Sequence, residues 1–318
     1  MSSGIRIVPA ILAAFSLFST GLFANDKRND PDQIGNRNVG RGLNFYSVEK
    51  EIQLGKELAE EVGHQSRVIN DPVVTEYVNR IGQNIVRNSD ANVVFTIKVL
   101  DSEEVNACAL PGGFLFINSG LILKADSEAE LAGVMAHEIA HVAARHATRQ
   151  ASRSELVRIA MVTASIALPY TMVGYGAIQA ANFLIPVGFL RLSRSMEREA
   201  DFLGLQYAYK TGYDPIALVD FFEKIQSMEK KKPGTLAKVF ASHPMTHNRI
   251  RTAQNEIQKT LGARREYVIN TSEFLDVKAR LASFHPYQRL HDDPDRPTLH
   301  RWNLNESGIL RSRVPPAR

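Results

Sequence analysis

Cysteine and tryptophan are nearly absent from this sequence. Of its 318 residues, one is a cysteine, Cys108, and one is a tryptophan. A single cysteine excludes an intrachain disulfide, so an apolar core has to hold the fold together. Cys108 has no recognisable histidine partner and no Gly-x-Ser-x-Gly pattern occurs, which argues against a cysteine or serine nucleophile. We expect Cys108 to be a small buried residue of a strand.

A strong excess of one charge is also missing. The formal net charge is +4 and the pI is near 9.1, which is only mildly basic. The basic residues form no cluster interleaved with aromatic side chains, so nucleic acid is not a predicted partner, whereas contact with an anionic membrane surface stays open. With 44% hydrophobic and 23% charged residues, the chain has the composition of a globular protein with a sizeable core.

The N-terminus has the pattern of a secretory signal. Arg6 supplies a short positive region, residues 7–23 are apolar, and Ala24 ends the run. We therefore predict a signal peptide over 1–24 and an exported protein. An uncleaved anchor, which would associate the protein with the inner membrane, is the alternative. Residues 25–45 are polar and are expected to form a flexible lead-in.

A second long stretch lacks charge altogether. Residues 159–190 contain no Asp, Glu, Lys or Arg, and the run is long enough to cross a bilayer. Pro169, Pro186, Gly174 and Asn182 divide it into shorter pieces. We interpret it as a mobile apolar lid or a buried helical hairpin. Membrane insertion is the alternative.

The most informative pattern is His-Glu-Ile-Ala-His at 137–141. It lies in a run that reads as one amphipathic helix from about Ser127 to Gln150, with one face packed into a core. Residues four apart share a helix face, so His137 and His141 can bind one metal ion, and imidazole nitrogens suit zinc. Glu138 then lies beside the metal and can accept a proton from a water molecule there.

A second carboxylate pair follows downstream. Glu197 and Asp201 are also four residues apart, so a second helix can offer Glu197 as the third metal ligand and Asp201 as a hydrogen-bond partner for the far nitrogen of a ligating histidine. Glu199 falls on another face and is expected to be solvated, as is His146. The alternative for Glu197 and Asp201 is a charged surface helix.

A hairpin is predicted just before the metal helix. Residues 105–110 and 114–118 read as strands around Pro-Gly-Gly. The first strand, with Asn106, Ala107, Cys108 and Ala109, is a candidate edge to which an extended substrate could add. The alternative is that the hairpin only completes the sheet.

With these blocks in view, the sequence resembles peptidase family M48, the zinc metallopeptidases that include the CaaX prenyl protease, HtpX and the periplasmic protease BepA. Four blocks carry the resemblance to the soluble, BepA-like branch: 106–120, the His-Glu-x-x-His helix, 193–201, and Ser242-His243-Pro244 with Arg249 following. The resemblance implies that His137, His141 and Glu197 bind zinc and that Glu138 is the catalytic base. It also implies that His243 can occupy the open metal position in a latent state. His243 and Arg249 are candidate donors to the oxyanion.

The predicted fold class is α+β, a mainly helical gluzincin-type metalloprotease domain with a small β-sheet beside the active-site helix. We expect this domain to span 46–262 and to bind one Zn²⁺ per chain. Residues 263–318 are expected to form a C-terminal appendage with a short helix near 272–281.

The predicted function is a zinc-dependent endopeptidase that acts on exported or misfolded envelope proteins. Together with the signal segment, the resemblance implies a location in the bacterial periplasm, and it adds the outer-membrane assembly machinery as an expected partner. One alternative is a chaperone-like protein that keeps the zinc but only binds outer-membrane proteins. The intact Glu138 argues against a pure binder, which needs no base beside the metal. The other alternative is a membrane-embedded protease.

Overall fold

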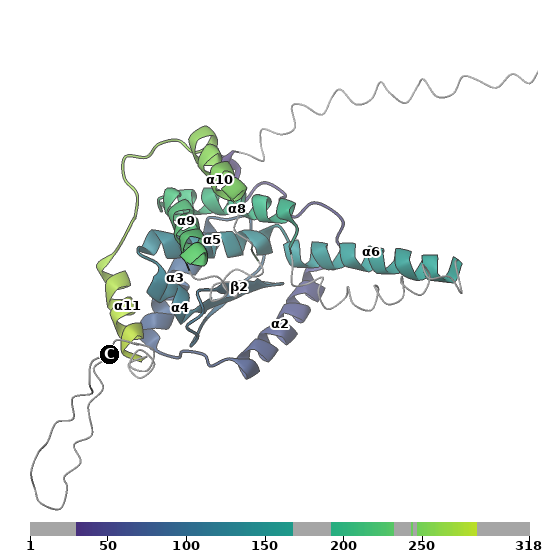
Figure 1. The fold of residues 1–318 in the computed structure, drawn as a ribbon, viewed down its shortest axis with the longest axis horizontal. Helices are drawn as coiled ribbons and strands as arrows, with labels where there is room; N and C mark the ends of the chain where they lie inside the picture. Colours follow the sequence, from purple (N-terminus) through teal and green to yellow (C-terminus); the bar gives the residue numbers. More distant parts are fainter. Residues whose placement is uncertain (1–29, 168–191, 232–242, 244–246, 285–318) are drawn as a thin grey trace, which may run out of the picture. The chain divides into compact units, whose positions relative to one another are not determined.

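The computed structural model describes residues 30–167, 192–231, 243 and 247–284 (Figure 1). A short 3-10 helix, Pro31–Gln33, comes first. The longer elements in chain order are α2 (Val48–Gln65), α3 (Pro72–Arg87), β1 (Thr96–Leu100), β2 (Ala107–Leu110), β3 (Phe114–Asn118), α4 (Ser119–Lys124), α5 (Glu128–Ala143), α6 (His146–Ala167), α8 (Arg194–Thr211), α9 (Ile216–Lys231), α10 (His247–Thr260) and α11 (Ser272–Phe284). The predicted α+β class, mainly helical with a small sheet, is confirmed.

Helix α5 lies at the centre of the fold. Helices α3, α8 and α9 and strand β2 all pack against it, and every residue from Glu128 to His141 is buried. The prediction of a helix with one buried face was therefore wrong. Small residues explain the difference, since they let neighbours approach from all sides. They are Ala129, Ala132, Gly133, Ala136 and Ala140.

The predicted single helix from Ser127 to Gln150 was also wrong in its length. The chain leaves α5 at Ala144, and Arg145 adopts a left-handed conformation with φ of 56° before α6 begins at His146. A non-glycine residue adopts this conformation only where its surroundings hold it. Here Arg145 donates to Glu51 Oε1 at 2.8 Å and to the carbonyl of Tyr46 at 2.6 Å.

The sheet has the strand order β1-β3-β2. β1 runs parallel to β3, with Thr96 opposite Phe114, whereas β2 runs antiparallel to β3, with Cys108 opposite Phe116. The hairpin from 105 to 118 is confirmed, with β2 starting after Asn106. Within the described residues, β2 is an outer strand. Its open edge lies beside α5 (Figure 1).

Side-chain caps and one glycine mark several of the helix boundaries. Ser127 accepts a hydrogen bond from the Glu130 N–H at 3.2 Å, and the Glu130 side chain accepts from the Asp126 N–H at 2.8 Å. Asp71 caps α3 in the same way. Gly212, with φ of 101°, ends α8 in the left-handed conformation that glycine adopts most easily.

Residues 30–45 pack against the rest of the domain, which differs from the expected flexible lead-in. Arg37 Nε lies 2.8 Å from Asp90 Oδ2 in a buried ion pair, and Asp90 also accepts from the Tyr207 hydroxyl at 2.8 Å. The Asn44 amide donates to Glu51 and Thr148, at 3.0 Å each. Asp90 and Thr148 are buried partners that lie far along the chain from this segment, and composition does not reveal such contacts.

The predicted signal peptide and most of the apolar stretch at 159–190 lie outside the described residues, apart from the end of α6. In the part of the chain that the structure describes, no helix is both long and apolar enough to span a bilayer. Helix α11 contributes Phe274, Val277 and Leu281 to the core. A second compact unit, residues 282–318, is described only in the last turn of α11.

Candidate metal centre

Helices α5 and α8 bring the predicted ligands together. They cross at Gly204, where an added Cβ would lie 2.9 Å from the His137 Cα. Real Cβ atoms essentially never come so close, so only glycine allows this approach. The crossing sets Glu197, in the first turn of α8, opposite His137 and His141 on α5.

The side-chain donors of these residues converge. His137 Nε2 and His141 Nε2 lie 3.0 Å apart, and each is 3.7 Å from an oxygen of Glu197. One ligand atom from each of His137, His141, Glu197 and His243 can be chosen so that all four lie within 4.8 Å of one another, and all four residues are buried. Burial, together with the neighbouring imidazoles, lowers the pKa of His141 well below its ordinary value, which favours the neutral ring that binds metals.

This donor set fits a zinc ion. Imidazole nitrogens with one carboxylate oxygen are a usual zinc ligand set. The outer nitrogen of each ring lies close to a possible acceptor: His137 Nδ1 is 3.1 Å from Asp201 Oδ1, and His141 Nδ1 is 2.8 Å from His146 Nδ1. Each neutral ring can therefore keep its proton on the outer nitrogen and turn the lone pair of Nε2 towards the common point.

Arg249 on α10 fixes the carboxylates. Its guanidinium donates to both oxygens of Asp201, at 2.8 and 2.6 Å, and a third nitrogen lies 3.0 Å from Glu197 Oε2. Burial alone would raise the pKa of Asp201, but Arg249 and His137 lower it to about 2. The sequence suggested Arg249 as an oxyanion donor. Its contacts with two buried carboxylates instead favour a role in holding them in place.

His243 lies in the same cluster. Its Nδ1 is 2.8 Å from Glu197 Oε1, and its Nε2 is 3.6 Å from Glu138 Oε1. Burial disfavours the charged ring, but the Glu138 and Glu197 carboxylates raise the pKa of His243 above its ordinary value. The backbone carbonyl of His243 accepts from Arg249 at 3.3 Å, which ties this loop residue to α10.

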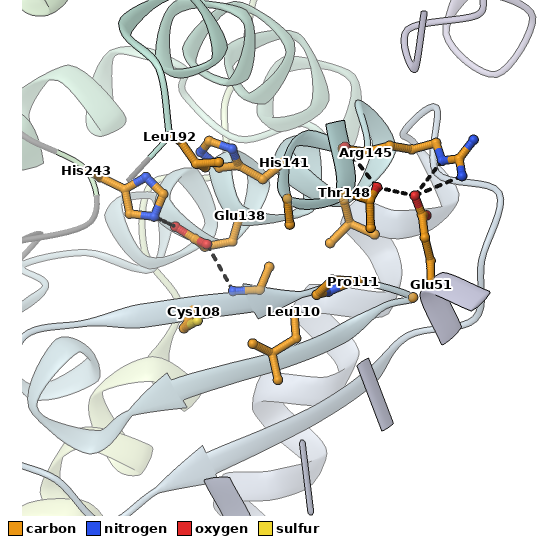
Figure 2. A pocket seen from close by; sticks show the side chains of 14 residues that line it. Glu51, Cys108, Leu110, Pro111, Glu138, His141, Arg145, Thr148, Leu192 and His243 are labelled. Atoms are coloured by element: carbon orange, nitrogen blue, oxygen red, sulfur yellow. Dashed lines mark hydrogen bonds and ion pairs between the residues drawn. The ribbon is translucent and has the colours of Figure 1, made fainter. Parts of the chain in front are cut away.

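Glu138 faces a pocket between β2 and α5 (Figure 2). Its Oε2 accepts a hydrogen bond from the Ala109 N–H at 3.1 Å. Its Oε1 is buried and has no hydrogen-bond partner among the described residues. The pocket is lined by the edge strand, the α5–α6 junction and His243, and reaches Glu51 and Arg145 at its far end. Its lining from β2 and the following turn is Cys108, Ala109, Leu110, Pro111 and Gly112.

Two expectations about single residues were wrong, and a third holds only in part. Cys108 is exposed on the pocket wall rather than buried, because β2 is an outer strand. His146 is fully buried rather than a surface residue, since the turn at Arg145 directs it back towards His141. Glu199, expected to be solvated, accepts hydrogen bonds from His146 and Arg149. The sequence signal for the contacts between His141, His146 and Glu199 is the position of His146, five residues after His141.

A protein-family comparison matches residues 72–257 to "Peptidase family M48", and this range contains α3 to α9, most of α10 and all the residues of the cluster. The chain belongs to peptidase family M48. This finding agrees with the resemblance noted from the sequence blocks.

Individual relatives cover much of the chain. It is 28% identical over 284 residues to the beta-barrel assembly-enhancing protease of Escherichia coli (strain K12), which covers 86% of this chain and 56% of that protein. It is 33% identical over 229 residues to the putative beta-barrel assembly-enhancing protease of Vibrio cholerae, covering 70% and 47%. The mitochondrial metalloendopeptidase OMA1 of Schizosaccharomyces pombe is 32% identical over 225 residues, covering 69% and 63%. The chain thus spans about half the length of the beta-barrel assembly-enhancing proteases it matches.

Proposed function

We propose that this M48 chain is a zinc-dependent endopeptidase that hydrolyses peptide bonds of protein substrates. The observation that carries the proposal is the convergence of His137, His141 and Glu197 at one buried point, with Glu138 beside them at the wall of a pocket. A surface helix with charged residues would leave these side chains apart and in water.

One zinc ion per chain would be held by His137, His141 and Glu197. Bound there, zinc supplies a Lewis acid that polarises a carbonyl and makes water more acidic. Asp201 and Arg249 support this ligand set, because they hold the outer nitrogen of His137 and an oxygen of Glu197.

Glu138 acts as the general base. It accepts the proton of the attacking water and then returns it to the leaving amine. Its two oxygens differ in a way that supports this role: the Ala109 N–H holds Oε2, while Oε1 is without a hydrogen-bond partner among the described residues and is the oxygen left to take a proton.

The substrate would bind as an added strand along β2. The segment of Asn106, Ala107, Cys108 and Ala109 lies at the outer strand of the sheet, and Cys108 and Ala109 line the pocket. Main-chain hydrogen bonds to such an edge select an extended backbone rather than a particular sequence. This mode suits a protease of unfolded chains.

His243 gives the site a latent state. One nitrogen of its ring lies within 4.8 Å of a ligand atom from each of the other three residues. His243 can therefore fill the open metal position at rest and leave when substrate binds. The alternative role for His243 is that of a donor to the developing oxyanion.

Exported or misfolded envelope proteins are the proposed substrates. Relatives named beta-barrel assembly-enhancing proteases support this class and a link with the outer-membrane assembly machinery. The predicted signal peptide over 1–24 supports a bacterial periplasmic location, with contact to a membrane surface as a further expectation. The proposed protease domain spans 46–262, and residues 30–45 and helix α11 pack against it.

The test compares the purified chain with Glu138→Gln in zinc content and in cleavage of casein and an unfolded porin. We expect stoichiometric zinc in both and cleavage only by the native chain, since loss of a general base costs about 10²–10⁴-fold in rate. Equal cleavage by both would refute the role of Glu138. Zinc in both with no cleavage by either, even after His243→Ala, would favour a chaperone-like binding protein.

A further inference from the structure

A buried chain of polar side chains leads away from the second metal-binding histidine. His141 Nδ1 lies 2.8 Å from His146 Nδ1, and His146 Nε2 lies 3.1 Å from Glu199 Oε2. His146 is fully buried. Arg149, on α6 with His146, donates to the same oxygen of Glu199 at 3.2 Å and to the carbonyl of Ala144 at 3.1 Å.

While both imidazole rings are neutral, the protons between His141, His146 and Glu199 can be arranged in only one way that satisfies every donor and acceptor. Glu199 is a carboxylate held by Arg149, so it accepts, and His146 must carry its proton on Nε2. His146 Nδ1 is then a bare lone pair, which accepts only if His141 carries its proton on Nδ1. The lone pair of His141 is thereby left on Nε2, the atom that lies 3.0 Å from His137 Nε2.

The opposite arrangement is unfavourable at both ends. If His146 donated from Nδ1, the lone pair on its Nε2 would face the Glu199 carboxylate without a proton between them. His141 would carry its proton on Nε2, inside the cluster of ligand atoms, and could not bind a metal there. The carboxylate on α8 therefore decides which nitrogen of His141 is free.

We propose that His146 and Glu199 are positioning residues that fix the tautomer and ring orientation of His141 for zinc binding. The inference rests on the proposed zinc site. Each metal-binding histidine then has its own supporting residues. Asp201 lies beside His137 and is held in place by Arg249. His146 lies beside His141, and Arg149 holds the Glu199 carboxylate that His146 contacts. Because Glu197, Glu199 and Asp201 all lie on α8, one helix supplies a ligand and both supporting carboxylates.

The test measures zinc affinity of the full chain by competition with a chromophoric chelator. In His146→Leu the acceptor for His141 Nδ1 is lost, and we expect zinc to bind about 10- to 100-fold more weakly. In His146→Asn the side-chain oxygen can replace Nδ1 as acceptor, so most of the affinity should return. Glu199→Leu should lose about 10-fold, near the lower limit of the same range, because its partly exposed site admits water to His146 Nε2.

Two further measurements separate positioning from loss of stability. The melting temperature of each zinc-free variant is recorded, and the visible absorption of the cobalt-loaded protein reports the ligand geometry. His247→Ala is the control, since His247 is an exposed histidine on α10 and should leave affinity and spectrum unchanged. We expect the cobalt spectrum to change in His146→Leu and to be restored in His146→Asn.

The outcomes are distinct. Native affinity in both His146→Leu and Glu199→Leu would overturn the inference while leaving the zinc site intact. Equal losses in His146→Leu and His146→Asn that follow their melting temperatures would also overturn it, since they would indicate only packing. If His146→Leu does not fold, the zinc affinity of Glu199→Leu decides between the inference and its rejection. A native chain that binds no zinc would overturn both this inference and the proposed function.

Discussion

The backbone N–H of Ala109 donates a hydrogen bond to Oε2 of Glu138, with 3.1 Å between nitrogen and oxygen. It therefore connects strand β2 directly to helix α5. Backbone groups of an antiparallel strand alternate in direction, and the carbonyl of Asn106 accepts from the Asn118 N–H on β3. Ala107 and Ala109 therefore face the open edge, where an added substrate strand would pair.

Removing this one donor should impair catalysis while leaving the metal in place. Ala109→Pro has no N–H, yet it breaks no hydrogen bond to β3, because the Ala109 N–H faces away from that strand. A hydrogen bond to a charged group is worth about 1.5–3 kcal/mol, so we expect kcat/KM to fall by about 10- to 100-fold. Ala109→Gly keeps the donor and is the matched control. Full activity in the proline variant would show that the contact is dispensable.

His243→Ala should increase the basal cleavage of an unfolded substrate. If the ring occupies the open metal position nine-tenths of the time, its removal raises the competent fraction about tenfold. Zinc content and the rate of casein cleavage are measured together. The control is His247→Ala, which removes an exposed histidine four residues further along the chain. An unchanged rate would exclude the latch, and a lower rate would favour a role for His243 as an oxyanion donor alone.

Arg249→Leu should destabilise the zinc-free protein strongly. The substitution leaves the buried carboxylates of Asp201 and Glu197 without their cation, and breaking such a buried pair costs about 3–5 kcal/mol. Zinc should recover part of the loss, because its charge compensates Glu197. Denaturant unfolding with and without zinc measures both effects. Arg251→Leu, an exposed arginine on the same helix, should change the free energy of unfolding little. Equal effects of the two substitutions would contradict this account of Arg249.

Gly204→Ala should push α8 away from α5 and weaken zinc binding. The new methyl group would meet the His137 backbone, with Cα at 2.9 Å and N at 3.0 Å, and backbone cannot move aside as a flexible side chain can. Overpacking of this kind costs about 1–3 kcal/mol. Gly63→Ala in α2 meets nothing within 4 Å and should be neutral or stabilising. Native zinc affinity in Gly204→Ala would show that the close crossing is not needed.

The parts of the site that follow from local spacing could be predicted from the sequence. His137 and His141 share a face of α5, and Glu197 and Asp201 share a face of α8, because residues four apart on any helix do so. Ser127, Asp71 and Gly212 cap their helices in the roles that these residue types usually take, so these three helix ends also depend on local sequence.

The parts that depend on distant contacts could not be predicted in this way. Arg145 adopts its left-handed conformation only because Glu51 and the Tyr46 carbonyl bind its side chain, and these lie about a hundred positions earlier. Without that turn, His146 would continue the predicted helix and face solvent. Arg37 and Asp90 likewise pair over a long separation in the chain, so a polar segment expected to be flexible is in fact packed.

The measurement that tests the central claim most directly is a crystal structure of the zinc-loaded native chain, with anomalous diffraction data collected on both sides of the zinc absorption edge. The account predicts one anomalous peak per chain, bound by Nε2 of His137, Nε2 of His141 and a carboxylate oxygen of Glu197, with Glu138 close by but not a ligand. A peak elsewhere, or one that has Glu138 as a ligand in place of Glu197, would contradict it.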